Sequence, residues 1–316
     1  MAVLVTCGEP AGIGPEIAAA AWQALRGEVP FVWLGDPAHL PPGTDFALVD
    51  SPSDAARSDA LPVLAHPFAA PNTPGTPDLR NAQSVIDVLA RGVEIVRSGA
   101  ASALCTAPIH KKVLMDGAGF AYPGHTEFLA ALTDAPRAVM MLASDALRVV
   151  PVTIHIALSD VPRALTPELL RETIRITAQD LQGQFGIDSP RLAVAGLNPH
   201  AGEGGAMGRE ELDWIADVVA EARSAGCDIT GPLPADTMFH APARARYDAA
   251  LCMYHDQALI PIKTLDFDRG VNVTLGLPII RTSPDHGTAF DIAGKGLANP
   301  TSMIEAIRMA HRIAGG

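Results

Sequence analysis

Short apolar runs alternate with segments of helical periodicity along much of the chain, and this alternation constrains the fold most strongly. The run "AVLVTCG" precedes "PEIAAAAWQAL", "SALCTA" precedes "PIHKKVLMDGAG", and "LRVVPVTIHI" precedes a helical pattern over residues 166–185. Strand-like runs that each lead into a helix are typical of an α/β fold with a mainly parallel sheet. At 316 residues, with 48% apolar residues, the chain is long enough for one large or two ordinary domains.

Capping residues mark some of the expected helices clearly. Thr166 is a suitable N-cap, Pro167 suits the first helical position, and Leu170, Ile174, Ala178, Leu181 and Phe185 recur on one face. The run "RLAVAGL" then predicts a strand, and "REELDWIADVVAEARSAG" predicts a helix that Gly226 ends. Residues 41–77 are rich in Pro, Ala, Ser and Asp and predict a long surface excursion with short elements.

The charge balance limits the possible partners. A formal net charge of −12 argues against binding to nucleic acid or to an anionic membrane surface. An anionic substrate would therefore need a local cationic pocket. With no apolar run near the ~20 residues of a membrane span and no signal-peptide pattern, we expect a cytoplasmic protein. The four scattered cysteines are expected to be reduced and mostly buried.

Three histidines follow apolar, strand-like runs. They are His155 in "VPVTIHIALSD", His200 in "VAGLNPHAGEGG" and His255 in "ALCMYHDQ". Open α/β sheets place ligands at the carboxyl ends of their strands, so the three imidazoles could converge on one metal ion. Three such ligands leave a fourth position open on a zinc-like ion, as a catalytic metal requires. Taken singly, each histidine fits a structural role in the core or a loop better than a ligand role, and only the three together favour a metal site.

Lysine is rare, with four residues against nineteen arginines. The four are Lys111, Lys112, Lys263 and Lys295. Because lysine is so rare in this chain, the four that occur suggest functional roles, such as binding phosphate or transferring a proton. Their occurrence by chance is the alternative explanation.

Two glycine-rich segments suit backbone that approaches a ligand closely. The stretch "GEPAGIGPE" (residues 8–16) lacks the Gly-Lys-Ser/Thr of a phosphate-binding P-loop and the spacing of a Rossmann turn. The stretch "DHGTAFDIAGKGLANPTSMIEA" (residues 285–306) leads into a C-terminal helix.

The second segment, with "GIGPE", resembles the adenosine-binding loop and the N-terminal motif of isopropylmalate and isocitrate dehydrogenases. The resemblance implies that His286 and Asn299 lie against adenine. It also implies that Asp291 accepts a hydrogen bond from a ribose 2′-hydroxyl, which favours NAD over NADP. Phe290 replaces the usual proline, which we expect to alter packing more than cofactor choice. Three residues of the N-terminal turn are expected near the cofactor: Gly12, Gly14 and Glu16.

Nearly the whole chain outside residues 30–80 resembles a narrower family, the 4-hydroxythreonine-4-phosphate dehydrogenases of vitamin B6 biosynthesis. The matching motifs, in order, are "GEPAGIGPE", "TAPIHK", "GHTEFLA", "NPHAGEGG", "GREE", "GPLPADT", "MYHDQ" and "VNVTLGLPIIRTSPDHGTA". The resemblance implies that the three histidines bind the metal, with His255 coming from the partner subunit of a homodimer. It also implies substrate contacts from His125, Thr126, Lys263, Asn272 and Arg281.

The fold implied by the resemblance is the two-domain α/β/α fold of the isocitrate and isopropylmalate dehydrogenases, with the active site in the interdomain cleft. We expect residues 1–118 and 266–316 to form a cofactor-side domain, and residues 119–265 a central domain for metal, substrate and dimer contacts.

The family reaction oxidises a secondary alcohol with NAD to a ketone β to a carboxylate, and decarboxylation follows. A divalent ion would lower the pKa of the substrate hydroxyl. Asp256 is the first candidate for the base, Lys111 the second and Asp236 a third, for which turn capping is an equal alternative. Arg281, Lys263 and Asn272 would bind the phosphate and carboxylate of a small anionic substrate.

Several alternatives remain open from the sequence. The same chemistry could act on D-threonate or D-erythronate 4-phosphate, or on an aromatic cis-dihydrodiol acid. Of a different class are the phosphate acyltransferases, which share the architecture without using NAD, and a non-catalytic metal- or metabolite-binding module. Histidine ligands favour Zn²⁺ or Co²⁺, and Mg²⁺ is possible if oxygen ligands are added.

Overall fold

The computed structural model describes residues 1–315, which divide into two compact units. Unit 1 joins residues 1–138 to the C-terminal segment from Val271, and unit 2 is the continuous segment Val139–Gly270. We predicted the first boundary after residue 118, but α4 (His125–Leu132) belongs to unit 1. Phe128 of α4 packs in a buried cluster with Val85, Leu89 and Leu114, so the boundary falls after the helix.

In unit 1 the strands pair in the order β3, β4, β2, β1, β5, β12, β11, and only β11 runs antiparallel to its neighbour. The four residues of β1 are completely buried, as expected for an apolar strand inside a parallel sheet. The strands are β1 (Val3–Thr6), β2 (Phe31–Gly35), β3 (Phe46–Leu48), β4 (Leu61–Ala65), β5 (Ala103–Thr106), β11 (Val271–Leu275) and β12 (Arg281–Pro284).

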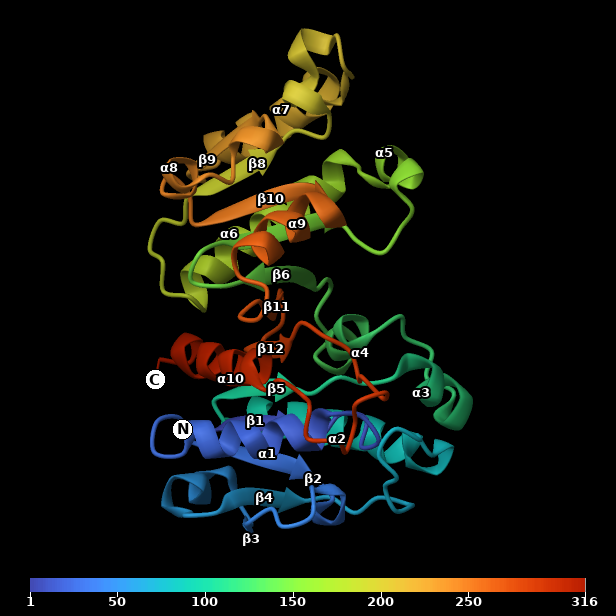
Figure 1. The fold of residues 1–316 in the computed structure, drawn as a ribbon. Coiled ribbons are helices and arrows are strands. Elements are labelled where there is room, and N and C mark those ends of the chain that lie inside the picture. Colours follow the sequence, from blue (N-terminus) through green and yellow to red (C-terminus); the bar gives the residue numbers. More distant parts are fainter. Residues whose placement is uncertain (316) are drawn as a thin grey trace. The chain divides into compact units, whose positions relative to one another are not determined.

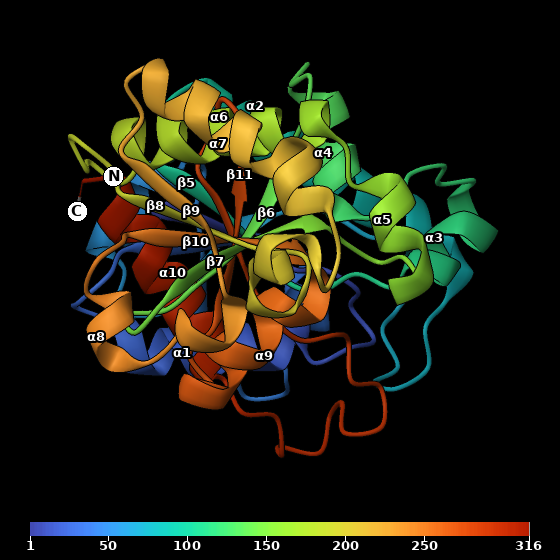
Figure 2. The ribbon, with the colours of Figure 1, turned by 90° about the horizontal axis from the view of Figure 1, so that it is seen from above.

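Helices cover both faces of this sheet. Helix α2 packs on β1 and β5 from one face, and α10 packs on β5 and β12 from the other, beside α1 (Figures 1 and 2). Their buried residues recur at helical spacing, as in Val85, Leu89 and Val93 of α2. The helical segments are α1 (Gly14–Leu25), η1 (Pro37–His39), η2 (Pro52–Arg57), η3 (Leu79–Asn81), α2 (Ala82–Arg97), α3 (Lys111–Ala118), α4 and α10 (Thr301–Ile313).

The segment 41–77, which we predicted as a surface excursion, contributes two strands to this sheet. Strand β4 is buried over Leu61–Leu64 and pairs in parallel with β2, and β3 pairs with β4. The predicted short elements are therefore present, but the prediction of a surface position was wrong for β4, which is buried in the sheet. Pro62 and the short length of both strands explain why the pattern in the sequence is weak.

In unit 2 the strands pair in the order β6, β7, β10, β8, β9, and only β6 and β7 are antiparallel to each other. Helices α6 and α7 lie on one face of the sheet and α9 on the other (Figure 2). The strands are β6 (Val139–Ala143), β7 (Arg148–Thr153), β8 (Leu192–Ala195), β9 (Ile229–Leu233) and β10 (Ala249–Tyr254).

The helices of unit 2 agree only partly with prediction. Thr166 caps α6 by accepting a hydrogen bond from the Leu169 amide at 3.2 Å, as expected, but α6 ends at Gly183. The helix predicted from residue 209 begins instead with a π-helical turn, η6. The helical segments are η4 (Leu158–Asp160), α5 (Val161–Ala164), α6 (Pro167–Gly183), η5 (Pro199–Gly205), η6 (Glu211–Ile215), α7 (Ala216–Ser224), η7 (Ala235–Thr237), α8 (Ala241–Arg244) and α9 (His255–Leu265).

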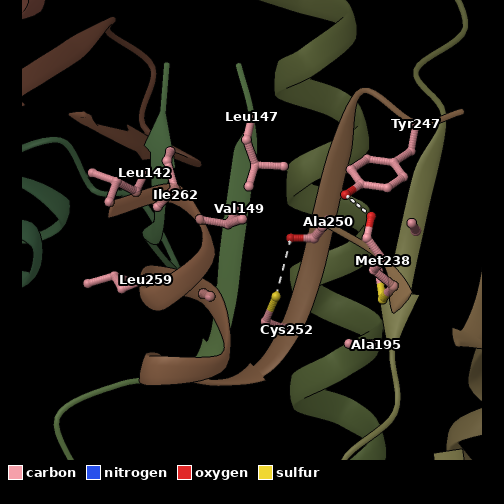
Figure 3. Packing of buried hydrophobic residues seen from close by; sticks show 12 residues of the cluster. Leu142, Leu147, Val149, Ala195, Met238, Tyr247, Ala250, Cys252, Leu259 and Ile262 are labelled. Atoms are coloured by element: carbon pink, nitrogen blue, oxygen red, sulfur yellow. Dashed lines mark hydrogen bonds between the residues drawn. The ribbon is translucent and has the colours of Figure 1, made fainter. Parts of the chain in front are cut away.

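The core of unit 2 lies between α9 and the central strands. Leu259 and Ile262 of α9 belong to one buried cluster with Val149 of β7 and Cys252 of β10 (Figure 3). Burying large aliphatic side chains of this kind contributes roughly 1.5–3 kcal/mol each. This packing fixes the start of α9, where His255 lies. All four cysteines are free and three are buried, as predicted.

Within the described residues, no helix is long and apolar enough to cross a membrane.

Candidate active site

The candidate site residues fall in both units. In unit 1, Arg281 is a buried cation at the start of β12, only 2% exposed. Its guanidinium donates to Thr106 Oγ1 at 2.6 and 3.2 Å and to Thr274 Oγ1 at 2.8 Å. No carboxylate in the described part of the chain pairs with it, and burial lowers its pKa to about 10. A buried guanidinium held only by hydroxyl groups is suited to receive an anion.

Two further predicted substrate residues of unit 1 have polar atoms that are buried without a partner. They are His125 Nε2 on α4 and Asn272 Oδ1 on β11. Burial, followed by the charge of Arg281, lowers the pKa of His125 well below its ordinary value, so its imidazole is neutral at pH 7. Buried polar atoms without partners are rare in folded proteins, and a bound polar ligand would satisfy both. Thr126 follows His125 in the first turn of α4.

The N-terminal turn lies against the C-terminal loop of unit 1. The carboxylate of Glu16 accepts hydrogen bonds from the backbone amides of Gly294 and Gly296, at 3.1 and 2.7 Å. A Cβ atom at Gly12 would lie 2.8 Å from the Thr288 carbonyl oxygen, and one at Gly14 2.5 Å from the Cys7 carbonyl oxygen. Glu16 and Gly12 therefore lie against the loop that was expected to bind adenosine, whereas Gly14 packs against Cys7 at the end of β1.

Within that loop, His286 Nδ1 lies 3.0 Å from the Gly287 carbonyl oxygen, and its Nε2 is buried without a partner. Asp291 is exposed. The side chain of Asn299 accepts from the Thr301 amide and hydroxyl, at 3.0 and 2.7 Å, and so helps to start α10. The ring of Phe290 packs on His110, the N-cap of α3, at a centroid distance of 5.0 Å.

A groove of about 730 Å³ runs beside this turn in unit 1. Gly12, Glu16, Gly294 and Gly296 line it, together with residues of α1 and of the loop around η1. Its volume is within the usual range for a small-molecule site. His286, Asp291 and Asn299 are not among its lining residues, so the groove includes only part of the predicted cofactor site.

In unit 2 a pocket of about 350 Å³ lies at the carboxyl ends of β7 and β10 and brings His155, His255 and Asp256 together. The two imidazole rings are 5.7 Å apart between centroids. Asp256 Oδ1 lies 2.7 Å from His255 Nδ1. A proton on Nδ1 shared with this carboxylate leaves Nε2 of His255 with a lone pair for a metal ion.

His200 lies on a loop after β8 and is not among the residues that line this pocket. Its Nδ1 is 2.5 Å from Glu203 Oε2. That hydrogen bond, and then the charges of Glu203 and Asp236, raise the pKa of His200. Asp236 lies in η7, and no hydrogen bond of its carboxylate gives it a capping role there.

The local chemistry of the three histidines fits metal binding, but they do not form a complete site within one chain. Nδ1 of His200 and Nδ1 of His255 are each hydrogen-bonded to a carboxylate, the arrangement that usually orients a ligating histidine. Among residues 1–315, no group of three potential ligands is close enough to hold an ion. Whether the partner subunit supplies His255 stays a prediction.

Two lysines differ in their surroundings. Lys111 is exposed at the start of α3, so the burial that would suit it to act as a base is lacking. Lys263 lies on α9 in unit 2, with Nζ 5.5 Å from the centre of the Phe267 ring. It therefore belongs to a different unit from Arg281 and Asn272.

Comparisons with known proteins decide the family. The sequence profile described as "Pyridoxal phosphate biosynthetic protein PdxA" matches residues 29–310. The chain belongs to the PdxA family. It is 70% identical over 315 residues to a 4-hydroxythreonine-4-phosphate dehydrogenase of Roseobacter denitrificans, covering 99% of this chain and 97% of the relative. The predictions of the family and of an enzyme are confirmed, and a dehydrogenase family implies a nicotinamide cofactor in general.

Solved structures agree with this assignment. A 4-hydroxythreonine-4-phosphate dehydrogenase from Klebsiella pneumoniae matches at 39% identity with a TM-score of 0.92, covering 99% of both chains. A terephthalate 1,2-cis-dihydrodiol dehydrogenase from Burkholderia xenovorans matches at 28% identity and a TM-score of 0.69, covering 99% of this chain and 98% of its own. A β-decarboxylating dehydrogenase from Thermococcus kodakarensis shares the fold at 16% identity and a TM-score of 0.52, covering all of this chain and 84% of its own. The predicted fold class is confirmed.

The structure of this PdxA family member also reveals residues that sequence patterns missed. Gln257 donates to the Gly196 carbonyl oxygen at 2.8 Å and accepts from the Met253 amide at 2.7 Å, which ties the start of α9 to the end of β8. Glu211 is a buried acid, 3% exposed, that bonds to Asn198 beside the His200 loop. The one signal in the sequence was their position within the motifs "MYHDQ", "GREE" and "NPHAGEGG".

Proposed function

We propose that the chain oxidises 4-phosphohydroxy-L-threonine with NAD, in a reaction that depends on a divalent metal ion, for the synthesis of pyridoxal phosphate. The product is a β-keto acid that loses carbon dioxide to give 3-amino-2-oxopropyl phosphate. The names of the close relatives support this substrate.

The observation that carries the proposal is the anion-receiving group of unit 1. Arg281 is buried without a carboxylate partner, and His125 Nε2 and Asn272 Oδ1 are buried without any partner. The neutral imidazole of His125 can donate to a phosphate or carboxylate oxygen without adding a second charge. This group would provide the local positive charge that a chain of net charge −12 needs for an anionic substrate. Thr126 and Lys263 would complete the substrate contacts.

His155, His200 and His255 would hold the metal ion, Zn²⁺ or Co²⁺ by ligand type and Mg²⁺ if oxygen ligands are added. When bound, the ion supplies Lewis-acid chemistry, lowering the pKa of the substrate hydroxyl and stabilising negative charge on its oxygen. Glu203 and Asp256 support this role, because each orients one of these imidazoles through Nδ1.

A base of the chain must take the hydroxyl proton while the hydride leaves carbon for the nicotinamide ring. Asp256 remains our first candidate, since it lies in the pocket of His155 and His255 with its side chain 70% exposed. Lys111 and Asp236 rank below it, because Lys111 is exposed on α3 and Asp236 acts on His200 through charge.

The preference for NAD over NADP rests on the loop over residues 285–299. An exposed carboxylate at Asp291 would accept from a ribose 2′-hydroxyl and repel a 2′-phosphate. Unpartnered His286 Nε2 supports a contact with adenine, and Glu16 holds the glycines of this loop.

We also propose a homodimer in which His255 is contributed across the interface. Large apolar side chains are exposed near the candidate metal ligands, which supports a subunit contact on unit 2. They are Ile156, Leu158, Met207, Leu212 and Ile260. A monomer with full turnover would contradict this proposal.

The test of function is NADH formation at 340 nm by metal-loaded protein. 4-Phosphohydroxy-L-threonine is compared with D-threonate and D-erythronate 4-phosphates, with NADP replacing NAD and with a chelator as controls. We expect turnover of the amino acid with NAD only, abolished by the chelator. Preference for a sugar acid would reject the substrate, and turnover in excess chelator would reject the metal requirement.

A second candidate substrate is an aromatic cis-dihydrodiol acid. The likeness to the Burkholderia xenovorans enzyme over 99% of this chain favours including it. The phosphate of the first substrate would be replaced by an aromatic carboxylate, so a cis-dihydrodiol of terephthalate belongs in the same assay.

A further inference from the structure

The loop that carries His200 has an unusual backbone. Positive φ angles run over six consecutive residues. The first five are His200 at 51°, Ala201 at 52°, Gly202 at 80°, Glu203 at 43° and Gly204 at 65°, and Gly205 follows at 94°. Only glycine adopts this left-handed conformation without a penalty, and three of the six residues are not glycine. Strained backbone persists only where surrounding contacts hold it, so the loop must be held.

Two carboxylates hold the loop through Asn198. Glu210 Oε2 accepts one hydrogen bond from Asn198 Nδ2 at 2.7 Å, and the buried carboxylate of Glu211 accepts two from Asn198. Glu211 Oε1 accepts from the Asn198 backbone amide at 2.8 Å, and Oε2 accepts from Asn198 Nδ2 at 2.9 Å. Asn198 lies two residues before His200. No cation in the described part of the chain forms an ion pair with Glu211, so its burial depends on these amide donors.

The surrounding backbone is shaped to admit this carboxylate. A Cβ atom at Gly202 would lie 2.8 Å from Glu211 Oε2, and one at Gly196 would lie 3.0 Å from Oε1. Glu211 is also the first residue of the π-helical turn η6. Such turns are rare and are frequently found at functional sites.

We propose that Glu211 is a positioning residue. Through Asn198 it holds the left-handed loop and thereby places the imidazole of His200 for the divalent metal ion. Glu203 fixes the protonation of the ring, whereas Glu211 fixes the backbone from which the ring projects. This inference rests on the proposed function for the role of His200 as a ligand.

The test uses the full-length protein with Glu211→Gln. The amide of glutamine has one acceptor oxygen, and its NH₂ group would face a donor of Asn198, so one of the two hydrogen bonds is lost. We expect the affinity of the metal-free protein for Zn²⁺, measured by calorimetric titration, to fall about 10- to 100-fold. Glu221→Gln removes the same charge from an exposed position on α7 and should leave this affinity unchanged.

A double variant separates positioning from general stabilisation. Ala201→Gly removes the penalty for a left-handed conformation at that residue, so the loop needs less support. In the Ala201→Gly background, Glu211→Gln should reduce Zn²⁺ affinity less than it does alone. An equal reduction in both backgrounds would show that Glu211 only stabilises unit 2.

A second readout does not depend on metal. The amides of Ala201 and Met207 donate to the carbonyl oxygens of Asn198 and Gly202, both at 3.1 Å. Deuterium exchange at these two amides should be faster in Glu211→Gln than in the unaltered chain. Unchanged exchange would overturn the holding role.

His200→Ala distinguishes failure of this inference from failure of the proposed function. If the unaltered chain binds Zn²⁺ and His200→Ala weakens binding while Glu211→Gln does not, the role of Glu211 is wrong and the ligand stands. If His200→Ala leaves binding unchanged, or the unaltered chain binds no Zn²⁺, the ligand assignment fails, and the positioning role fails with it.

Discussion

In unit 1 the key side chain, Arg281, begins a strand and is held by two threonine hydroxyls from neighbouring strands, whereas in unit 2 His200 projects from a left-handed loop that a buried acid supports. The contrast follows from what each group would do in the proposed reaction. A buried cation can receive an anion from the unstrained frame of a sheet. The proposed metal ligand lies in a loop beyond a strand end, and this loop carries about 1–2 kcal/mol of strain at each non-glycine residue with positive φ.

The largest effect should come from the sheet-held cation. Arg281→Lys keeps the charge but removes the planar guanidinium, which can donate to Thr106, Thr274 and an anion at the same time. We expect kcat/KM for the phosphorylated substrate to fall about 10²- to 10³-fold, within the 2–5 kcal/mol range for a buried charged contact. Steady-state kinetics measure this, with the exposed Arg26→Lys as control. Near-normal kcat/KM in Arg281→Lys would remove the anion-binding role.

Carboxylates that orient the histidines should have the next largest effect. Glu203→Gln and Asp256→Asn should each lower Zn²⁺ affinity about 10- to 100-fold, because Nδ1 of His200 or His255 loses its charged partner. Calorimetric titration measures the change, and the exposed Asp160→Asn is the control. At saturating metal the two variants should differ, since a base at Asp256 leaves kcat low in Asp256→Asn alone. Equal recovery of kcat would exclude Asp256 as the base.

A smaller effect is expected at Glu16, which holds the proposed cofactor loop by two hydrogen bonds to backbone amides. Glu16→Gln replaces two charge-assisted hydrogen bonds to Gly294 and Gly296, and should raise KM for NAD about 10-fold at unchanged kcat. Initial rates at varied NAD measure this. Glu28→Gln, in an exposed ion pair with Arg308, is the matched control. A fall in kcat without a change in KM would show that Glu16 acts elsewhere.

The smallest effect concerns pH. The pKa of His125 is lowered in the folded chain, so the unfolded chain binds more protons as pH falls below about 6.5. Folding stability should therefore decrease on acidification through this range, by at most about 1.4 kcal/mol per pH unit for this one group. His125→Gln should show a shallower loss of thermal stability between pH 7 and pH 5.5. An identical slope in both proteins would contradict this interpretation.

The features that could be predicted from the sequence are those that depend on residues close together in the chain. His155, His200 and His255 each follow an apolar run that forms a strand. Such runs can be recognised in the sequence, and parallel strands end at the same edge of a sheet. Thr166 capped its helix as expected because an N-cap depends on residues only three positions apart.

Features that depend on distant contacts were not predictable in this way. The roles of Glu16 and Glu211 arise from hydrogen bonds to loops elsewhere in the chain, and spacing does not encode such partners. Strand β4 was missed because its proline weakens the pattern while pairing with β2 stabilises it. The exposure of Lys111 depends on where α3 lies, which its sequence does not specify.

The discontinuity of unit 1 has a consequence for biosynthesis. Strand β12 lies between β5 and β11, and both β11 and β12 come from the last 46 residues of the chain. The hydrogen-bond donors to the Glu16 carboxylate, the amides of Gly294 and Gly296, likewise lie 278 and 280 positions later in the chain. During translation unit 2, an uninterrupted segment, can fold while the N-terminal part of unit 1, residues 1–138, still exposes the edge of β5. Nascent chains that have residue 270 outside the ribosome and the last segment still inside would thus combine a folded unit 2 with an open sheet edge in unit 1, the state in which chaperones would be needed most.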